Sequence, residues 1–262
     1  MGDEKPRHLY KYCHWNKYAR KILWNNELYL NSAKNFNDPF DSCIMFNLKG
    51  SNDEWFRATI DMIAELSKRK LTQEEKEEWK KKIYFADTDE LKDSRREFVE
   101  QLVMGKTRTN SGICCFSKEK DNILMWSHYA KDHTGICLEF DYSNPAFPPV
   151  RKVIYEENYP PINIVDINNK EKITDLYFTK SKDWEYENEY RISNVDVIND
   201  TIEFDPQILT GVICGEAMKE KDVKQLIRFL SCRSTPLTLY KAERKKYQFG
   251  LDIEEIGRFN YI

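Results

Sequence analysis

Short stretches in which apolar and polar residues alternate recur along the chain. Each predicts a strand, because successive side chains of a strand point to opposite faces. Two precede residue 33, HLYKYCHW and LYLNS. Those after residue 111 are ICLEFD, KVIYEE, INIVDI, the second half of SKDWEYENEYRIS, LTLYKAE and FGLDIEEI, and the apolar runs GICCFS and LTGVICG predict two further strands. VDVIND and TIEFDP are expected to pair as a hairpin around Asn199 and Asp200.

Apolar residues at helical spacing lie between these strands. They predict helices over residues 16–26, with Asn25 and Asn26 as a left-handed cap, and over EKITDLYFTK and GEAMKEKDVKQLIRFL. Asp121 is the expected N-cap of a further helix, NILMWSHYAK.

The stretch from about residue 51 to 105 is charged, nearly free of Gly and Pro, and helical in period. Thr72 and Glu75 form a predicted capping box at the start of TQEEKEEWKKKI. Trp55, Ile60 and Ile63 indicate an earlier helix, and Phe98, Leu102 and Val103 a later one, which gives roughly three helices. About fifty residues are few for independent folding, so we expect a helical insert or covering layer.

Single helices set among strands and hairpins favour an α+β fold with a mixed, mostly antiparallel sheet and flanking helices. The length of 262 residues and a hydrophobic content of 40% suit a single domain over residues 1–262. No window is apolar enough for a membrane helix, and the N-terminus lacks a secretory pattern. We therefore expect a cytoplasmic protein without a membrane partner.

The net charge of the chain bears on whether it binds nucleic acid. The chain has 41 basic and 44 acidic residues, and a net charge of −3 does not favour general nucleic-acid binding. The local basic run at residues 241–246 is typical of a solvated face. Seven scattered cysteines without a signal peptide predict free thiols.

The first candidate site is the segment WEYENEYR. On a strand, Glu187, Glu189 and Arg191 would share one face, because every second side chain does. Two carboxylates beside a guanidinium could serve catalysis, with the arginine keeping one carboxylate ionised. The same pattern also suits an ion-pair ladder on a solvated strand. Trp184 is expected to be largely buried and to anchor this strand.

The second candidate is the helix MWSHYAKDHTG. Trp126 and Ala130 fall on one stripe, and Tyr129 and His133 on another. With His128, the aromatic residues could form a pocket wall that stacks on a flat ring. An amphipathic helix with aromatic residues in the core is the alternative interpretation.

The third candidate is the NFNDPFD turn, where Asn37 and Asp38 either stabilise a corner or reach into a cleft. Five Cys and His residues lie close together between residues 114 and 137, but the C-x-x-C and H-x-x-x-H spacings of zinc sites are absent. We therefore predict no metal site. No phosphate-binding glycine motif occurs either.

Several motifs taken together resemble an uncharacterised bacterial family, domain of unknown function 2971 (DUF2971). They are LYKY at residues 9–12, NFNDPF at 35–40, CFS at 115–117, MWSHYAKDHTGICLEF at 125–140 and KDWEYENEYR at 182–191. The resemblance spans nearly the whole chain outside the helical stretch. It highlights Tyr10, Lys11 and Tyr12 as ligand-binding candidates beside the residues above.

The order of strands is also similar to the ADP-ribosyltransferase plan. That resemblance implies Lys11 at an early NAD-holding position, Tyr129 as the aromatic contact and Glu189 as the acid. The departure is that Lys11 is neither His nor Arg, and that Tyr129 falls on a helix.

Two functions are therefore open. One is an NAD-consuming enzyme, an ADP-ribosyltransferase or NAD glycohydrolase, acting in phage defence or as a toxin, with NAD as substrate and no tightly bound cofactor. The other is a non-enzymatic sensor module for a small ligand or nucleotide. They differ in whether the Glu187, Glu189 and Arg191 face lines a cleft opposite Trp126 and Tyr129.

Overall fold

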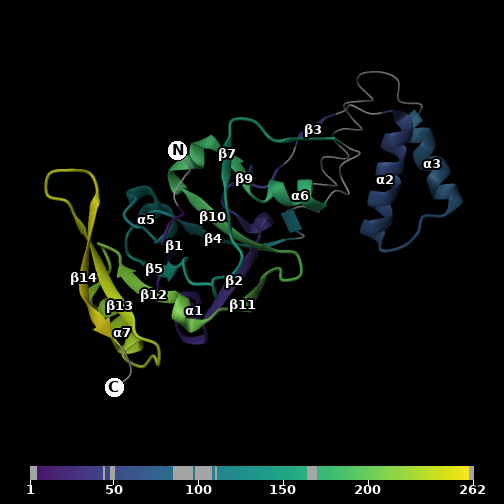
Figure 1. Cartoon of the computed structure of the whole chain (residues 1–262). Coiled ribbons are helices and arrows are strands. Elements are labelled where there is room, and N and C mark those ends of the chain that lie inside the picture. Colours follow the sequence, from purple (N-terminus) through teal and green to yellow (C-terminus); the bar gives the residue numbers. More distant parts are fainter. Residues whose placement is uncertain are drawn as a thin grey trace. The chain divides into compact units, whose positions relative to one another are not determined.

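The computed structural model describes residues 5–43, 45–47, 51–84, 97, 108–109, 111–163 and 170–259. The chain divides into two compact units (Figure 1). The first unit contains Met1–Asn31, Gly112–Val153 and Asp183–Ile262, and the second contains Ser32–Ser111 and Ile154–Lys182. Whether the chain forms a single domain stays a prediction.

The first unit is built on a sheet to which the described part of the chain contributes ten strands. The strands are β1 (His8–Cys13), β2 (Glu27–Ser32), β4 (Gly112–Ser117), β5 (Ile136–Asp141), β6 (Arg151–Lys152), β10 (Glu189–Asn194), β11 (Asp200–Glu203), β12 (Leu209–Cys214), β13 (Leu237–Arg244) and β14 (Leu251–Phe259). The order is β11-β2-β4-β1-β5-β12-β13-β14, and β10 pairs with β4 and β6.

Most of these strand pairs are antiparallel, and β12 with β13 is the parallel exception among the registers known. The sheet, together with its helices, confirms the predicted α+β class with a mixed, mostly antiparallel sheet.

The two faces of the sheet pack against different helices. On the back face, Leu9 and Leu138 join a core that includes Leu23 of α1 (Lys17–Asn25) and Leu226 of α7 (Glu220–Leu230). On the front face, Tyr12, Cys137 and Ile213 pack with Trp126 of α5 (Ile123–Tyr129). Neighbouring residues of β5 thus serve opposite faces, as strand alternation requires.

Asparagine side chains set the bounds of two helices. Asn16 caps the start of α1, and Asn26 ends it with a φ of 56°, which confirms the predicted left-handed cap. The predicted cap of α5 is wrong by one residue. Asn122, and not Asp121, accepts hydrogen bonds from the amides of Leu124 and Met125.

The second unit contains three helices and two strand pairs in its described part. The helices are α2 (Asn52–Ser67), α3 (Gln73–Tyr84) and α6 (Lys170–Leu176), and the parallel pairs are β3 (Met45–Asn47) with β8 (Pro161–Asn163) and β7 (Ile154–Glu156) with β9 (Thr179–Ser181). A short 3-10 turn spans Ala33–Asn35.

The capping box before α3 is confirmed. The Thr72 amide donates to the Glu75 carboxylate, and the Glu75 amide donates to the Thr72 hydroxyl. The third predicted helix, around Phe98, Leu102 and Val103, lies outside the described residues, and so does INIVDI beyond residue 163. The role of this stretch as a covering layer stays a prediction.

The predicted hairpin around Asn199 and Asp200 is wrong. Residues 195–199 form turns, and β11 pairs with β2 instead, with Asp200 opposite Leu30. Ile202 then packs against the back-face core, and this burial outweighs the local preference for a hairpin. The helix predicted over EKITDLYFTK also ends early, at Leu176, because residues 179–181 join β9.

Candidate functional site

Glu189 and Arg191 form a buried ion pair on β10. The guanidinium donates from Nε to Oε1 at 2.8 Å and from Nη2 to Oε2 at 2.9 Å. The side chains share one face of the strand, as alternation predicts. Cys115 lies opposite Arg191 on β4, and burial, together with the charge of Glu189, raises the pKa of its thiol well above the usual value.

Glu187 does not lie on this strand, so that part of the prediction is wrong. It ends a 3-10 helix (Lys182–Glu187), and Asn188 follows with a φ of 44° before β10 begins. The left-handed Asn188 breaks the two-residue alternation, so the faces of Glu187 and Glu189 cannot be inferred from strand geometry.

Glu187 is nevertheless a buried carboxylate with an aromatic contact. Tyr129 donates its hydroxyl proton to Oε1 of Glu187 at 2.6 Å, and Ser117 donates to the Glu187 carbonyl oxygen. The structure thus brings Tyr129 of the second candidate site to Glu187 of the first.

Trp126 belongs to the core. Its side chain has no solvent exposure, and its indole N–H donates to the Lys120 carbonyl oxygen. Its ring packs edge-on against that of Tyr12, with the ring centres 5.2 Å apart. Tyr12 is buried in the same way and donates to the Glu119 carbonyl oxygen. For Trp126 the structure agrees with the interpretation of a core aromatic residue.

His133 lies beyond the helix that was predicted to carry it. α5 ends at Tyr129, and Lys131, Asp132 and His133 all have positive φ values. The imidazole ring stacks on Trp126 with the ring centres 6.3 Å apart. The helical stripe of Tyr129 and His133 is therefore absent, because the chain turns away after one short helix.

His128 lies on the exposed side of α5. Its Nδ1 is 3.0 Å from the Tyr186 hydroxyl, and its ring lies 6.3 Å from that of Trp184. Trp184 is partly buried, which does not contradict the expectation that most of its side chain is removed from water. The 3-10 helix ahead of β10 places its ring 6.0 Å from that of Tyr186.

A row of register partners crosses the front face from Glu189 to the last strand. The partners, one per strand from β10 to β14, are Glu189, Ser117, Tyr10, Glu139, Gly211, Thr238 and Arg258. Because directly paired residues lie on the same face, their side chains all belong to the front face.

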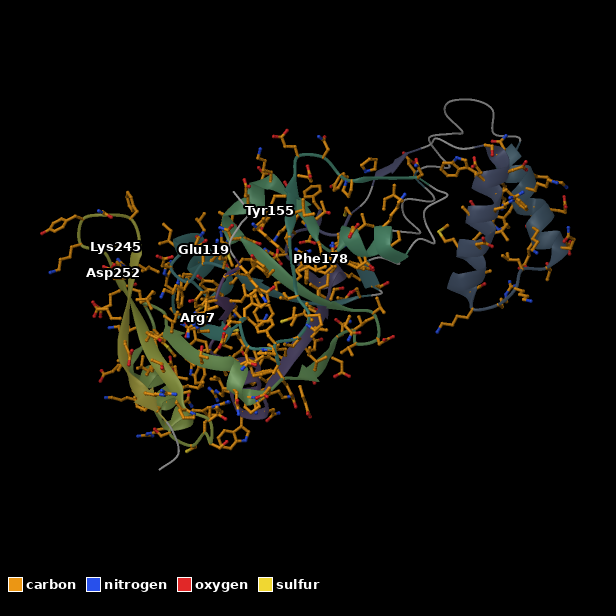
Figure 2. The ribbon with its side chains drawn as sticks, viewed as in Figure 1. Arg7, Glu119, Tyr155, Phe178, Lys245 and Asp252 are labelled. Carbon is orange, nitrogen blue, oxygen red and sulfur yellow. The ribbon has the colours of Figure 1, made fainter. Side chains whose placement is uncertain are left out.

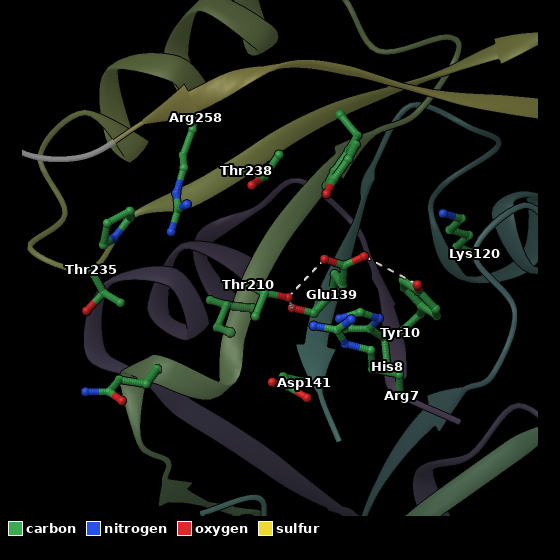
Figure 3. A pocket seen from close by; sticks show the side chains of 14 residues that line it. Arg7, His8, Tyr10, Lys120, Glu139, Asp141, Thr210, Thr235, Thr238 and Arg258 are labelled. Carbon is green, nitrogen blue, oxygen red and sulfur yellow. Dashed lines mark hydrogen bonds between the residues drawn. The ribbon is translucent and has the colours of Figure 1, made fainter. Parts of the chain in front are cut away.

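A pocket of about 610 Å³ opens over this row between β1 and β14 (Figure 3). The residues that line it are Arg7, His8, Tyr10, Lys120, Glu139, Asp141, Gln207, Leu209, Thr210, Thr235, Pro236, Thr238, Tyr240 and Arg258. We call it the Glu139 pocket, because a buried carboxylate lies at its floor.

Glu139 has only 8% of its surface exposed. Thr210 donates to Oε1 at 2.9 Å and Tyr10 donates to Oε2 at 3.3 Å, as the dashed lines in Figure 3 show. Burial and the Glu139 charge both raise the pKa of Tyr10 above its ordinary value, so its phenol remains a donor.

A β-bulge and a glycine shape the floor beside this carboxylate. The register of β12 against β5 shifts at Thr210, and bulges of this kind re-aim side chains next to functional sites. A Cβ on Gly211 would lie 3.1 Å from Oε1 of Glu139 and 2.9 Å from the Tyr240 ring. Glycine is therefore needed here because the carboxylate and the Tyr240 ring pack directly against its backbone.

Cations surround the buried carboxylate. Arg7, Lys120 and Arg258 line the pocket, and none of them forms an ion pair with any residue that the structure describes. Burial raises the pKa of the Asp141 carboxyl group, but two hydrogen bonds from Ser143 and the charges of His8 and Arg7 outweigh this effect and lower the pKa overall. The rim thus has three cations without an ion pair to a described residue, with the Arg7 charge partly offset by Asp141, and the floor has a negative charge.

Lys11 points away from this row. Its neighbour Tyr10 lies on the front face, so Lys11 lies on the back face. Its ammonium group donates to the Cys115 carbonyl oxygen at 3.2 Å and lies 5.5 Å from the centre of the Phe116 ring. The structure therefore separates Lys11 from Glu189 by the thickness of the sheet.

Asn37 and Asp38 belong to the second unit. Asn37 is exposed, and Asp38 is buried with its Oδ1 accepting a bond from the Phe40 amide. This is the local turn that the sequence predicts. A ligand-binding role for either residue stays a prediction.

The basic run of the β13–β14 hairpin is largely paired. Lys241 contacts Glu243, Arg244 contacts Glu216, and Lys245 lies 3.8 Å from Asp252 where the connecting loop joins the two strands (Figure 2). This pairing agrees with a solvated face.

All seven cysteines are free thiols. Within the described ranges, no group of three or more His, Cys, Asp or Glu side chains is placed to hold a metal ion. In the same ranges no helix has the length and apolar character needed to cross a bilayer.

Sequence reasoning missed most of the Glu139 pocket. One signal was present, the single carboxylate inside the otherwise apolar run ICLEF. Arg7, Lys120, Thr210 and Arg258 gave no signal, because strand pairing over long sequence separations brings them together.

Residues 125–192 match the model of a family described as "Protein of unknown function (DUF2971)". The match confirms the family resemblance over this segment, which carries Trp126, Tyr129, Glu139, Glu189 and Arg191. No curated protein and no solved structure matches the chain.

Proposed function

We propose that the first unit is a binding module that holds a small phosphate-bearing ligand of the nucleotide class in the Glu139 pocket. The observation that carries the proposal is the set of three pocket cations, Arg7, Lys120 and Arg258, none of which forms an ion pair with a residue that the structure describes. Guanidinium and ammonium groups bind phosphate through charge-assisted hydrogen bonds. A bound phosphate would supply the missing negative charge.

The size and the lining of the pocket support the same function. A volume of about 610 Å³ falls within the range of small-molecule sites. Two tyrosine rings, Tyr10 and Tyr240, could contact a flat or apolar part of the ligand, and three threonines supply hydroxyl groups. Such sites fix ligand orientation with a few placed polar groups.

NAD cleavage is the second candidate function. It is favoured by two buried carboxylates, Glu187 and Glu189, close together in the chain, with Tyr129 bonded to the first. A carboxylate can stabilise the positive charge that develops on a ribose during glycosidic cleavage. Arg191 donates hydrogen bonds to both oxygens of Glu189. NAD cleavage therefore requires either that this ion pair separates or that Glu187 is the carboxylate that stabilises the ribose cation.

The binding function is tested by calorimetric titration of the full chain with AMP, ADP-ribose and NAD. Arg258→Gln should weaken binding by about tenfold or more, since one hydrogen bond to a charged group contributes about 1.5–3 kcal/mol. Arg228→Gln, an exposed arginine on α7, is the matched control and should leave affinity unchanged. Absence of binding, or equal losses in both variants, would contradict the proposal.

The enzymatic function is tested separately. Purified protein is incubated with NAD, and released nicotinamide is measured by mass spectrometry. Release that disappears in Glu189→Gln or Glu187→Gln would establish cleavage. If NAD binds and no nicotinamide is released, the result supports a binding module without cleavage activity. A cytoplasmic location and a part in phage defence stay predictions.

A further inference from the structure

The acceptor capacity of Glu139 is only half used. An ionised carboxylate offers about four lone-pair positions. Thr210 and Tyr10 donate to one oxygen each, and no Lys, Arg or His side chain in the described ranges lies within ion-pair distance. A carboxylate that is 8% exposed, yet lines a pocket, is thus prepared for donors that the chain does not supply.

The geometry of the floor presents both oxygens side by side. Thr210 holds Oε1 and Tyr10 holds Oε2, so the carboxylate is fixed from two directions. Gly211 lets Oε1 and the Tyr240 ring pack against its backbone, because a Cβ there would lie 3.1 Å from that oxygen and 2.9 Å from the ring. A ligand group that meets both oxygens at once therefore finds them oriented in advance.

We infer that Glu139 binds two neighbouring hydroxyl groups of a sugar, so that the ligand is a nucleoside phosphate or sugar phosphate and not a bare phosphate. This inference rests on the proposed function, which places the phosphate at a cation of the pocket rim, with Arg258 as the contact that is tested. Two adjacent hydroxyls can donate one hydrogen bond to each carboxylate oxygen. A carboxylate facing a ribose in this way is a recurrent means of reading its hydroxyls.

The arrangement of charge fits a ligand with two different ends. Figure 3 shows Glu139 at the centre of the pocket, with Arg258 and Lys120 on separate sides of it. The cations suit the anionic end, and the carboxylate repels it. A phosphate placed against Glu139 itself would bring like charges together. The sugar therefore lies over Glu139 and the phosphate lies at the rim.

The experiment compares AMP with 2′,3′-dideoxy-AMP, which retains the phosphate and the base. Titration of the wild-type chain should give about a tenfold to hundredfold weaker affinity for the dideoxy compound, since a buried charged acceptor is left unpaired. In Glu139→Gln this difference should shrink to about threefold or less, because the charge is gone. Glu203→Gln, an exposed glutamate on β11, is the control and should keep the full difference.

The outcomes separate the two ideas. Equal wild-type affinities for AMP and the dideoxy compound, or an undiminished difference in Glu139→Gln, would overturn the hydroxyl inference and leave the proposed function intact. If AMP, ADP-ribose and ribose 5-phosphate all fail to bind, both the hydroxyl inference and the proposed binding function are contradicted.

Gly211→Ala provides a second variant in case Glu139→Gln does not fold. Its methyl group crowds Oε1, so AMP should lose affinity while the dideoxy compound loses less. Equal losses for the two compounds would count against hydroxyl recognition.

Discussion

Arg191 donates hydrogen bonds to both carboxylate oxygens of Glu189, two residues before it on β10. The two side chains are 1% and 3% exposed, so the whole ion pair is removed from water. The free energy lost by removing two charges from water is about as large as the stabilisation from their mutual attraction. Removing one member of such a pair, however, leaves the other charge buried without that counter-charge. The pair is therefore sensitive to single substitutions.

The first prediction follows from this asymmetry. Arg191→Met should lower the free energy of unfolding by about 3–5 kcal/mol, because the Glu189 charge remains buried without its partner. The double variant Glu189→Met, Arg191→Met should lose much less. Urea unfolding of the two proteins gives the comparison, and equal losses would show that the pair does not act as a unit.

The second prediction concerns two tryptophans with different surroundings. Trp126 is completely buried, so Trp126→Ala should cost about 3–5 kcal/mol of unfolding free energy. Trp184 is partly buried, so Trp184→Ala should cost about 1 kcal/mol. Chemical denaturation of both variants checks the order, and a larger loss for Trp184 would contradict the burial of these side chains.

The third prediction concerns thiol reactivity. The thiolate is the reactive form, and burial raises the pKa of Cys214 to about 12 and that of Cys137 well above its usual value. Cys232 is exposed and should be alkylated first at pH 8. Raising the pH to 9 should still leave Cys137 and Cys214 unmodified. Mass spectrometry of the native protein tests this order, and denatured protein should take up seven equivalents.

The fourth prediction distinguishes the two faces of the sheet. Lys11 lies on the back face, so Lys11→Met should change the affinity for AMP by less than about twofold, as expected for a site with no shared partners. An ADP-ribosyltransferase arrangement, in which Lys11 holds NAD, requires a large loss. Titration with AMP and NAD decides between the two, and a tenfold loss for either would place Lys11 in the site.

Local chemistry made part of this fold predictable. The alternation in ICLEFD and LYKY gives the strands β5 and β1 and also which residues share a face. The left-handed Asn26 and the Thr72–Glu75 box follow from side-chain hydrogen bonds within a few residues. Glu189 and Arg191 were brought together by the same two-residue period.

The remaining features depend on contacts between distant segments. β11 pairs with β2 across about 170 residues, because Ile202 gains burial there that a local hairpin does not provide. The left-handed backbone at Asn188 removes Glu187 from its expected strand. The Glu139 pocket needs the order of five strands, which side-chain periodicity does not specify.

The front-face row has a consequence for how this chain can change in evolution. Deleting one residue between Gly135 and Glu139 would change the register of β5 by one position. Either the residues before the deletion would then exchange faces, or Glu139 would take the position of Leu138 and its carboxylate would enter the back-face core. An odd-numbered insertion or deletion in this strand is therefore expected to be tolerated only where a β-bulge restores the faces. Among relatives of any length, the spacing from Gly135 to Glu139 should keep its parity even where the surrounding loops vary.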